Sequence, residues 1–320
     1  MDNSSVMKSG ASQPVTFNSL SELLERLDLP APQHPLIAMI NYNNVKPGLA
    51  DAGKRFLLSF YKISFKTGSF RGSINYGQTR YDFQDGGLAF LAPNQLVEMP
   101  GNEDHFDGYT LYFHPDLLSG YPLAGSIHHF GFFSYTISEA LYLSDKEKMV
   151  VEALFQSIAT ELENRIDQFS QDVLVSQIGL LLNHSNRFYN RQFLTRKAVH
   201  HDLIDGMHAY LSDRFERKVS LLTGLPSAQE VAGHLRVSPR YLSDMLKTLT
   251  GKTTQQHIHL RLIDKAKEML ATGTLTTAEI AYELGFEQPQ SFNKLFKQKT
   301  RLSPALFREN KAALIDPKKG

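Results

Sequence analysis

The chain has 320 residues, 42% of them apolar and 21% charged, which is the balance of an ordinary soluble protein long enough for two domains. It contains no cysteine, which excludes disulfides, thiolate metal sites and cysteine nucleophiles. The net charge of +1 conceals an asymmetry, because residues 187–320 hold 22 lysines and arginines against 13 acidic residues. This distribution favours nucleic-acid binding in the C-terminal part and another task in the N-terminal part.

The first 20 residues are polar and lack the apolar segment of a signal peptide. No run of about 18 apolar residues follows, so we expect a cytoplasmic protein without a membrane span. Residues 1–34 are expected to be partly disordered. Within them, Ser19 and Glu22 are placed to cap a short helix that ends before Pro30.

Residues 35–143 show β-type patterning. Asp85-Gly86-Gly87 is a strong hairpin turn between two of the apolar runs. Short strands at this spacing predict a small sandwich or barrel. The candidate strands are Leu36–Tyr42, Arg55–Phe65, Gly72–Tyr76, Thr79–Phe83, Leu88–Leu91 and Tyr109–Phe113.

Residues 144–192 have a helical pattern, which begins with a capping box formed by Ser144 and Glu147. Two long amphipathic helices are predicted, and the second carries a narrow apolar stripe. We predict that one helix meets its counterpart in a second subunit, which gives a homodimer. In the alternative, both helices pack on the β domain of their own chain. The stripe consists of Leu174, Ile178, Leu181 and Leu182.

Residues 193–226 are predicted to form a lead-in helix and a linker, in which Lys218–Leu225 joins two helices. Residues 227–311 then contain the same pattern twice, from Ala228 to Gly251 and from Ala278 to Arg301. An internal repeat of this kind determines the fold of the whole segment. Residues 312–320 form a tail.

Each copy predicts two helices joined by a tight turn. The first helix of each copy opens with a capping box, formed by Ser227 with Glu230 and by Thr276 with Glu279. The second helix has an apolar face and a polar face. Guanidinium, amide, ammonium and hydroxyl groups on that polar face can contact base edges and phosphates in a major groove. The predicted DNA-contacting residues are Arg240, Ser243, Asp244, Lys247, Gln290, Asn293, Lys294 and Lys297.

Thr254–Leu270 lies between the copies and repeats apolar residues at helical spacing. About 17 residues at 1.5 Å each span roughly 26 Å. A helix of this length can hold the two polar faces near the ~34 Å repeat of the major groove, on one side of a duplex.

The doubled motif, the connecting helix and the closing segment Leu302–Arg308 resemble the DNA-binding domain of AraC-type bacterial transcription regulators, over about residues 213–310. The sequence departs from the family pattern at three positions. Arg236 and Arg301 stand where glycines are common, which predicts local adjustments. Asp244 stands where a basic residue often reads bases, so it either accepts from a cytosine amino group or stays clear of the DNA.

The resemblance implies a cupin-like barrel for the N-terminal domain, dimerisation through the helices that follow it, and a contact with RNA polymerase. Gly87–Glu98 is similar to the second sequence motif of cupin barrels. The expected fold is therefore α+β, with a small barrel and two helices before an all-α double helix-turn-helix domain. A barrel of this kind can hold one small molecule. The candidate effector-binding residues are Tyr76, Arg80, Tyr81, Glu98 and Tyr112.

Two alternatives remain from the sequence. One is a cupin-type enzyme, but no His-x-His pair occurs between Arg55 and Phe113, and Glu98 stands where a later histidine ligand belongs. We therefore expect no metal, no cofactor and no catalytic residues. The other is a DNA-binding regulator whose barrel has lost its ligand and serves only as a scaffold.

Overall fold

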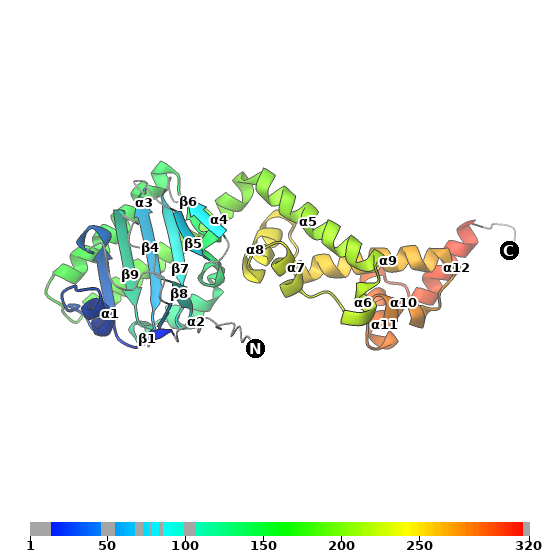
Figure 1. Cartoon of the computed structure of the whole chain (residues 1–320), viewed down its shortest axis with the longest axis horizontal. Helices are drawn as coiled ribbons and strands as arrows, with labels where there is room; N and C mark the ends of the chain where they lie inside the picture. The colour runs from blue at the N-terminus through cyan, green and yellow to red at the C-terminus, as the bar shows by residue number, and fades with distance from the viewer. Residues whose placement is uncertain are drawn as a thin grey trace, which may run out of the picture. The chain divides into compact units, whose positions relative to one another are not determined.

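The computed structural model describes residues 14–45, 55–67, 73–76, 79–82, 86–98 and 107–315. The chain divides into two compact units, Met1–Gln192 and Phe193–Gly320 (Figure 1). The first unit is built around β-sheets and the second is entirely helical in its described part, which confirms the α+β prediction. Of residues 1–34, for which partial disorder is expected, positions 1–13 lie outside the described part of the chain, and positions 14–34 contain strand β1 and helix α1.

The N-terminal unit contains a five-stranded antiparallel sheet of strand order β10-β7-β4-β9-β2. A three-stranded sheet of order β1-β3-β8 and the hairpin β5-β6 complete the β structure (Figure 1). The strands are β1 Val15–Phe17, β2 Ile37–Asn41, β3 Arg55–Leu58, β4 Tyr61–Thr67, β5 Ser73–Tyr76, β6 Thr79–Asp82, β7 Gly87–Leu91, β8 Leu96–Glu98, β9 Asp107–Phe113 and β10 Leu141–Tyr142.

Side chains alternate between the two faces of the five-stranded sheet, so each face packs on a different partner. Ala38 and Tyr112 lie on the face that packs with Phe56 of β3 and with helix α1, Leu20–Arg26. Phe65 and Tyr109 lie on the opposite face, where both rings contact Phe155 of helix α3, Asp145–Glu163, at centroid distances of 5.6 and 6.1 Å. The sheet is therefore covered on both sides.

Short helical turns connect these elements. Pro115 begins one of them, where its fixed backbone angle suits a first helical position. The turns are η1 Tyr42–Asn44, η2 Pro115–Leu118, α2 Pro122–Ser126, η3 Ile127–His129, η4 Gly131–Ser134 and η5 Ile137–Glu139.

Two long helices follow, α3 Asp145–Glu163 and α4 Ser170–Thr195. The apolar stripe of α4 lies inside the N-terminal unit, because Leu174, Ile178, Leu181 and Leu182 are each at most 1% exposed. The assignment of this stripe to an interface between subunits is therefore corrected: the stripe is core, as in the alternative outlined above. An amphipathic pattern shows only that a face is covered, and here the same chain covers it.

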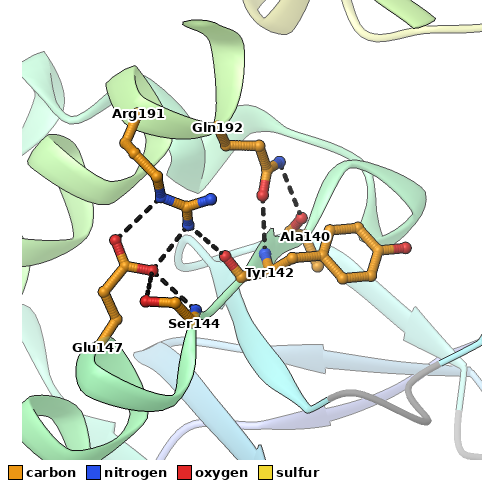
Figure 2. Close-up of polar contacts among 6 residues, drawn as sticks. All are labelled: Ala140, Tyr142, Ser144, Glu147, Arg191 and Gln192. Carbon is orange, nitrogen blue, oxygen red and sulfur yellow. Dashed lines mark hydrogen bonds and ion pairs between the residues drawn. The ribbon is translucent and has the colours of Figure 1, made fainter. Parts of the chain in front are cut away.

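The C-terminal end of α4 is anchored to the beginning of α3 and to β10 (Figure 2). The Arg191 guanidinium donates to both carboxylate oxygens of Glu147 at 2.9 and 2.8 Å, and to the Tyr142 carbonyl at 2.6 Å. The Gln192 side chain accepts from the Tyr142 N–H at 2.8 Å. Glu147 also accepts from the Ser144 N–H at 2.8 Å, so one carboxylate serves both the capping box and the anchor.

The C-terminal unit consists of helices packed around the long helix α9. Its first residues continue α4, and its remaining helices are α5 Lys197–Glu216, α6 Val219–Thr223, α7 Ala228–His234, α8 Pro239–Thr250, α9 Thr254–Thr272, α10 Thr277–Glu283, α11 Pro289–Thr300 and α12 Pro304–Ile315 (Figure 1).

Candidate nucleic-acid interface

Helices α7 and α8 form the first helix-turn-helix motif, and α10 and α11 form the second. Both predicted capping boxes are present. The Ser227 N–H donates to Glu230 at 2.7 Å, and the Thr276 N–H donates to Glu279 at 2.7 Å. Each box satisfies two backbone groups that a helix start leaves without intrahelical partners. The entry helix of each motif therefore begins at the residue that the sequence indicates.

The two turns have the same backbone hydrogen bond, from Val237 N–H to Ala232 C=O at 3.0 Å and from Phe286 N–H to Ala281 C=O at 2.9 Å. This geometry requires a left-handed residue. Gly285 supplies it in the second motif with φ of 95°, and Arg236 supplies it in the first with φ of 57°. A non-glycine residue in this conformation lowers the stability by roughly 1–2 kcal/mol. Arg236 in place of a glycine therefore destabilises the turn locally without changing its geometry.

Arg301 ends helix α11 in the same way that Gly251 ends α8. Both residues are left-handed, with φ of 66° and 73°, and both N–H groups bond to a carbonyl four residues earlier, at Lys297 and Lys247. The second departure from the family pattern is therefore also a local adjustment.

The second helix of each motif presents the predicted polar face. In α8, Leu242, Met245 and Leu246 are fully buried, while Arg240 and Lys247 are exposed. Ser243 and Asp244 lie on the same side as these two and are half-buried. With about 100° of rotation per residue, the polar set covers the side of the helix opposite the buried one.

Helix α11 repeats this arrangement. Phe292 and Phe296 are fully buried and contact each other at a centroid distance of 5.7 Å. The outward set is exposed at every position and consists of Gln290, Asn293, Lys294 and Lys297. The second motif therefore presents amide and ammonium donors without an acidic residue among them.

Asp244 forms an ion pair with Arg240 on the preceding turn of α8. The Arg240 Nε donates to Asp244 Oδ2 at 2.9 Å. An arginine held through Nε has a fixed orientation of its guanidinium plane, since the planar fork leaves few rotamers once one donor is fixed. The structure thus shows Asp244 in contact with Arg240, an interaction that neither sequence-based alternative for Asp244 includes.

Helix α6 and the end of α5 precede the first motif in the chain, and they contact the entry helices of both motifs. The contacts of this segment were not predicted from the sequence, which indicated only a linker at Lys218–Leu225. Lys218 Nζ lies 2.7 Å from Glu283 Oε1, at the end of α10. Gly224 contacts Gly285 so closely that a Cβ at Gly285 would stand 2.6 Å from the Gly224 carbonyl carbon. The turn of the second motif therefore rests directly on the segment that leads into the first.

Arg214 at the end of α5 is the buried cation of this connection. Its Nη2 donates to Thr223 Oγ1 at 2.7 Å and to the Gly224 carbonyl at 3.2 Å, and it pairs with Glu230 at 3.4 Å. The only sequence signal for it is a lone arginine in an otherwise amphipathic helix, which is too common to be informative.

The candidate effector residues are only partly described. Tyr76 lies in β5, Arg80 and Tyr81 lie in β6, and Glu98 lies in β8, but their side chains are outside what the structure describes. Tyr112 is described and is 7% exposed. Its ring packs edge-on against Phe60 at 5.7 Å, so Tyr112 belongs to the core between the sheets.

In the described residues, no group of three or more histidine, aspartate or glutamate side chains is arranged to hold a metal ion. Across the same part of the chain, no helix has the length and apolar character needed to cross a membrane.

A family model described as "Helix-turn-helix domain" matches residues 231–310. Two relatives are each named HTH-type transcriptional activator RhaS. The protein of Klebsiella pneumoniae is 26% identical over 147 residues, and that of Salmonella paratyphi B is 30% identical over 148 residues. These matches cover 46% of this chain and 48% of each relative, so the chain spans about half the length of the curated relatives it matches.

Among solved structures, the C-terminal domain of AraT, a response regulator from Geobacillus stearothermophilus, is 27% identical and matches 34% of this chain and 84% of its own, with a TM-score of 0.30. ToxT from Vibrio cholerae is 14% identical over 85% of this chain and 96% of its own, with a TM-score of 0.29.

The two capped motifs, their matched polar faces and the family match define the C-terminal unit as a tandem helix-turn-helix domain. Its sequence motifs resemble those of the AraC-type DNA-binding domain.

Proposed function

We propose that the protein is a sequence-specific, DNA-binding transcription regulator of the cytoplasm rather than an enzyme. The observation that carries the proposal is the pair of matched polar faces on α8 and α11, joined by the 19-residue helix α9. Helix α9 spans about 28 Å at 1.5 Å per residue, which suits two recognition helices in successive major-groove turns. The N-terminal unit is proposed to bind a small-molecule effector, and DNA-bound protein to contact RNA polymerase.

The proposal includes a homodimer. Because the apolar stripe of α4 is buried in its own chain, a second copy would have to bind the opposite, exposed side of α4 and of the residue before it. Phe169, Val173 and Leu180 are exposed apolar residues there. They are the residues that a second copy of the chain would cover.

The experiment that tests the function is footprinting of the full chain on DNA upstream of its own gene and of neighbouring genes. A regulator that docks both motifs protects two major-groove segments about one helical turn apart. Uniform weak protection of all fragments would reject sequence-specific regulation and leave only general affinity for polyanions.

The second recognition helix supplies a direct test of base reading. Gln290→Ala should lower affinity for the footprinted site by about 1–3 kcal/mol and relax the base preference at one position, because an amide can bond an adenine edge bidentately. Gln298→Ala is the matched control, since Gln298 is exposed on the same helix but lies about 80° away from Gln290. Equal losses of affinity for specific and for random DNA would show that Gln290 does not read a base.

Asp244 is expected to act through Arg240. Asp244→Ala should lower affinity for the specific site, because Arg240 loses its fixed orientation, and raise affinity for random DNA, because a negative charge leaves the interface. We expect the ratio of specific to random affinity to fall about tenfold. Fluorescence anisotropy on both DNAs measures the two constants.

Asp264→Ala provides the control for charge alone, because Asp264 is an exposed acid on α9 paired with Lys267 at 3.6 Å. It should change both affinities by the same small factor. If Asp244→Ala also raises both affinities together, Asp244 does not position Arg240.

A further inference from the structure

A cavity of about 410 Å³ opens in the N-terminal unit beside strand β2. Its walls are β2 itself, the C-terminal half of α3 and the segment Leu29–Gln33. Strand β2 is the last strand of the five-stranded sheet, so its outer edge pairs with no other strand in the described residues. A volume of this size lies within the range of natural small-molecule sites. An unpaired strand edge therefore forms one side of a ligand-sized cavity.

The register of β2 determines which of its backbone groups face this cavity. The His114 N–H donates to the Leu36 carbonyl, and pairs that exchange hydrogen bonds alternate along the strand with pairs that do not. Ala38 and Ile40 are therefore bonded to β9, while the N–H and C=O groups of Met39 point to the outer edge. Among the described residues, Met39 has no backbone partner on that side. One residue of β2 thus presents a donor and an acceptor to the cavity.

The free edge is short, because the chain closes it at both ends. His34 forms an antiparallel bridge with Ile37 at the beginning of the strand. At the other end, the helical turn η1 starts after Asn41, whose side chain accepts from the Asn43 N–H. A strand of another protein that continues in both directions would meet these two ends. The edge is instead long enough for a free peptide of about three residues.

The side chains around the cavity add carboxamides and one carboxylate. Gln33, Asn44 and Gln156 line it, and each can both donate and accept a hydrogen bond. Glu163 is the single charged residue of this lining within the described part of the chain, and leucines and prolines supply apolar surface. This composition disfavours an anion. It matches a peptide, whose backbone needs donors and acceptors and whose side chains need apolar contact.

The two faces of the sheet determine which peptide side chains the cavity can accept. Met39 lies opposite Leu111 of β9, which shares its face with Tyr109 and therefore with α3, the helix that carries Glu163. A peptide residue paired with Met39 points its side chain to that face, because paired residues share a face. The residues before and after it point to the opposite face, where Leu24 of α1 lines the cavity. The preferred order is therefore apolar, basic, apolar.

We propose that this cavity binds a short free peptide, which extends the sheet at the edge of β2 through two hydrogen bonds with the Met39 backbone. The central residue of the peptide is basic and faces Glu163, and its two neighbours are apolar. This inference rests on the effector part of the proposed function and names the effector as a peptide.

The probe is the capped peptide Ac-Leu-Lys-Leu-NH2, added to the full-length protein with isotope-labelled methionine methyl groups. Met39→Leu identifies the Met39 methyl signal in NMR spectra, and this signal should shift in a saturable manner. A peptide N-methylated at lysine and at the second leucine cannot donate to the Met39 carbonyl in either strand direction. It should bind at least about tenfold more weakly. No saturable shift with the first peptide, or equal affinity of the methylated one, would overturn the proposal.

A pair of alanine substitutions tests where the peptide binds. Ala159 lines the cavity from α3, so Ala159→Leu should narrow it and weaken binding by about tenfold. Ala153→Leu is the matched control, because Ala153 is exposed on the same helix outside the cavity, and it should leave the affinity unchanged. Circular dichroism and the Tm verify that both variants are folded. Undiminished binding to folded Ala159→Leu would place the peptide elsewhere and reject this site.

The charge preference has its own test. Glu163→Gln should lower affinity for the lysine peptide about two- to fivefold, as expected for an exposed ion pair, and leave affinity for Ac-Leu-Gln-Leu-NH2 unchanged. Glu152→Gln removes a carboxylate from an exposed position of α3 that does not line the cavity, and it should change neither affinity. An undiminished preference for lysine in Glu163→Gln would contradict the placement of the central residue.

Affinity for the footprinted DNA, measured with and without Ac-Leu-Lys-Leu-NH2, separates this inference from the function on which it rests. The peptide should change that affinity in the parent protein and have less effect in Ala159→Leu. Specific DNA binding without any peptide effect would reject the peptide as the effector and leave the regulator in place. A saturable shift of the Met39 signal without specific DNA binding would reject the proposed regulator and retain the peptide site.

Discussion

Replacing Gly285 with alanine should lower the free energy of unfolding of the C-terminal unit by about 2–4 kcal/mol. The added Cβ would stand 2.6 Å from the carbonyl carbon of Gly224, 2.7 Å from its oxygen and 2.9 Å from the Leu225 nitrogen. All three atoms belong to the backbone and cannot move aside alone. The residue would also have to keep φ at 95°, where an L side chain is strained.

Gly233→Ala is the matched control for this substitution. Gly233 lies in helix α7, and a Cβ there meets nothing within 4 Å. Alanine is the better helix former by about 1 kcal/mol, so this variant should be slightly more stable than the parent. Differential scanning calorimetry of both full-length variants measures the contrast. Equal stabilities would show that the Gly224–Gly285 contact yields easily.

Arg214→Met should destabilise the same unit by about 2–4 kcal/mol, because methionine keeps the aliphatic packing but loses the charge-assisted hydrogen bonds to Thr223 and to the Gly224 carbonyl. Those groups lie in the short segment that leads into the first motif and that contacts the turn of the second motif. Affinity for DNA should fall as well, since the lost bonds hold that segment in place. Urea unfolding measures the first effect and anisotropy the second.

Arg217→Met separates burial from charge. Arg217 is on the next turn and pairs with Asp213 at 2.7 Å, but the two side chains are 74% and 55% exposed. An exposed pair of this kind contributes at most about 1 kcal/mol. If Arg217→Met lowers the free energy of unfolding as much as Arg214→Met does, the buried contacts of Arg214 are not what stabilises this part of the C-terminal unit.

The helix-turn-helix motifs could be predicted from sequence because their determinants are local. A capping box spans four residues, and the polar and apolar faces of α8 and α11 follow from the helical period within a single helix. The connection through α6 could not be predicted in this way. Gly224 and Gly285 are 61 positions apart, and a glycine before Pro226 has the pattern of an ordinary linker.

The stripe of α4 shows a different limit. Periodicity establishes that Ile178 and Leu181 are covered, but it does not identify what covers them, because a second subunit and the core of the same chain leave the same pattern. The role of Asp244 was equally open from sequence. An acid four residues after an arginine on a helix predicts an ion pair. The two alternatives considered for Asp244, a base contact or a position clear of the DNA, did not include this neighbour on the same helix.

Helix α9 fixes more than a distance between the motifs. Each residue of a helix adds 1.5 Å of length and about 100° of rotation, so inserting one residue in Thr254–Thr272 would turn the second recognition helix away from the groove that the first one enters. Gradual lengthening of α9 cannot adapt the domain to a different base-pair spacing. Only insertions close to whole helical turns return the second recognition helix to the same side as the first. Binding sites for this domain are therefore expected to vary in base sequence while keeping one spacing between their two halves.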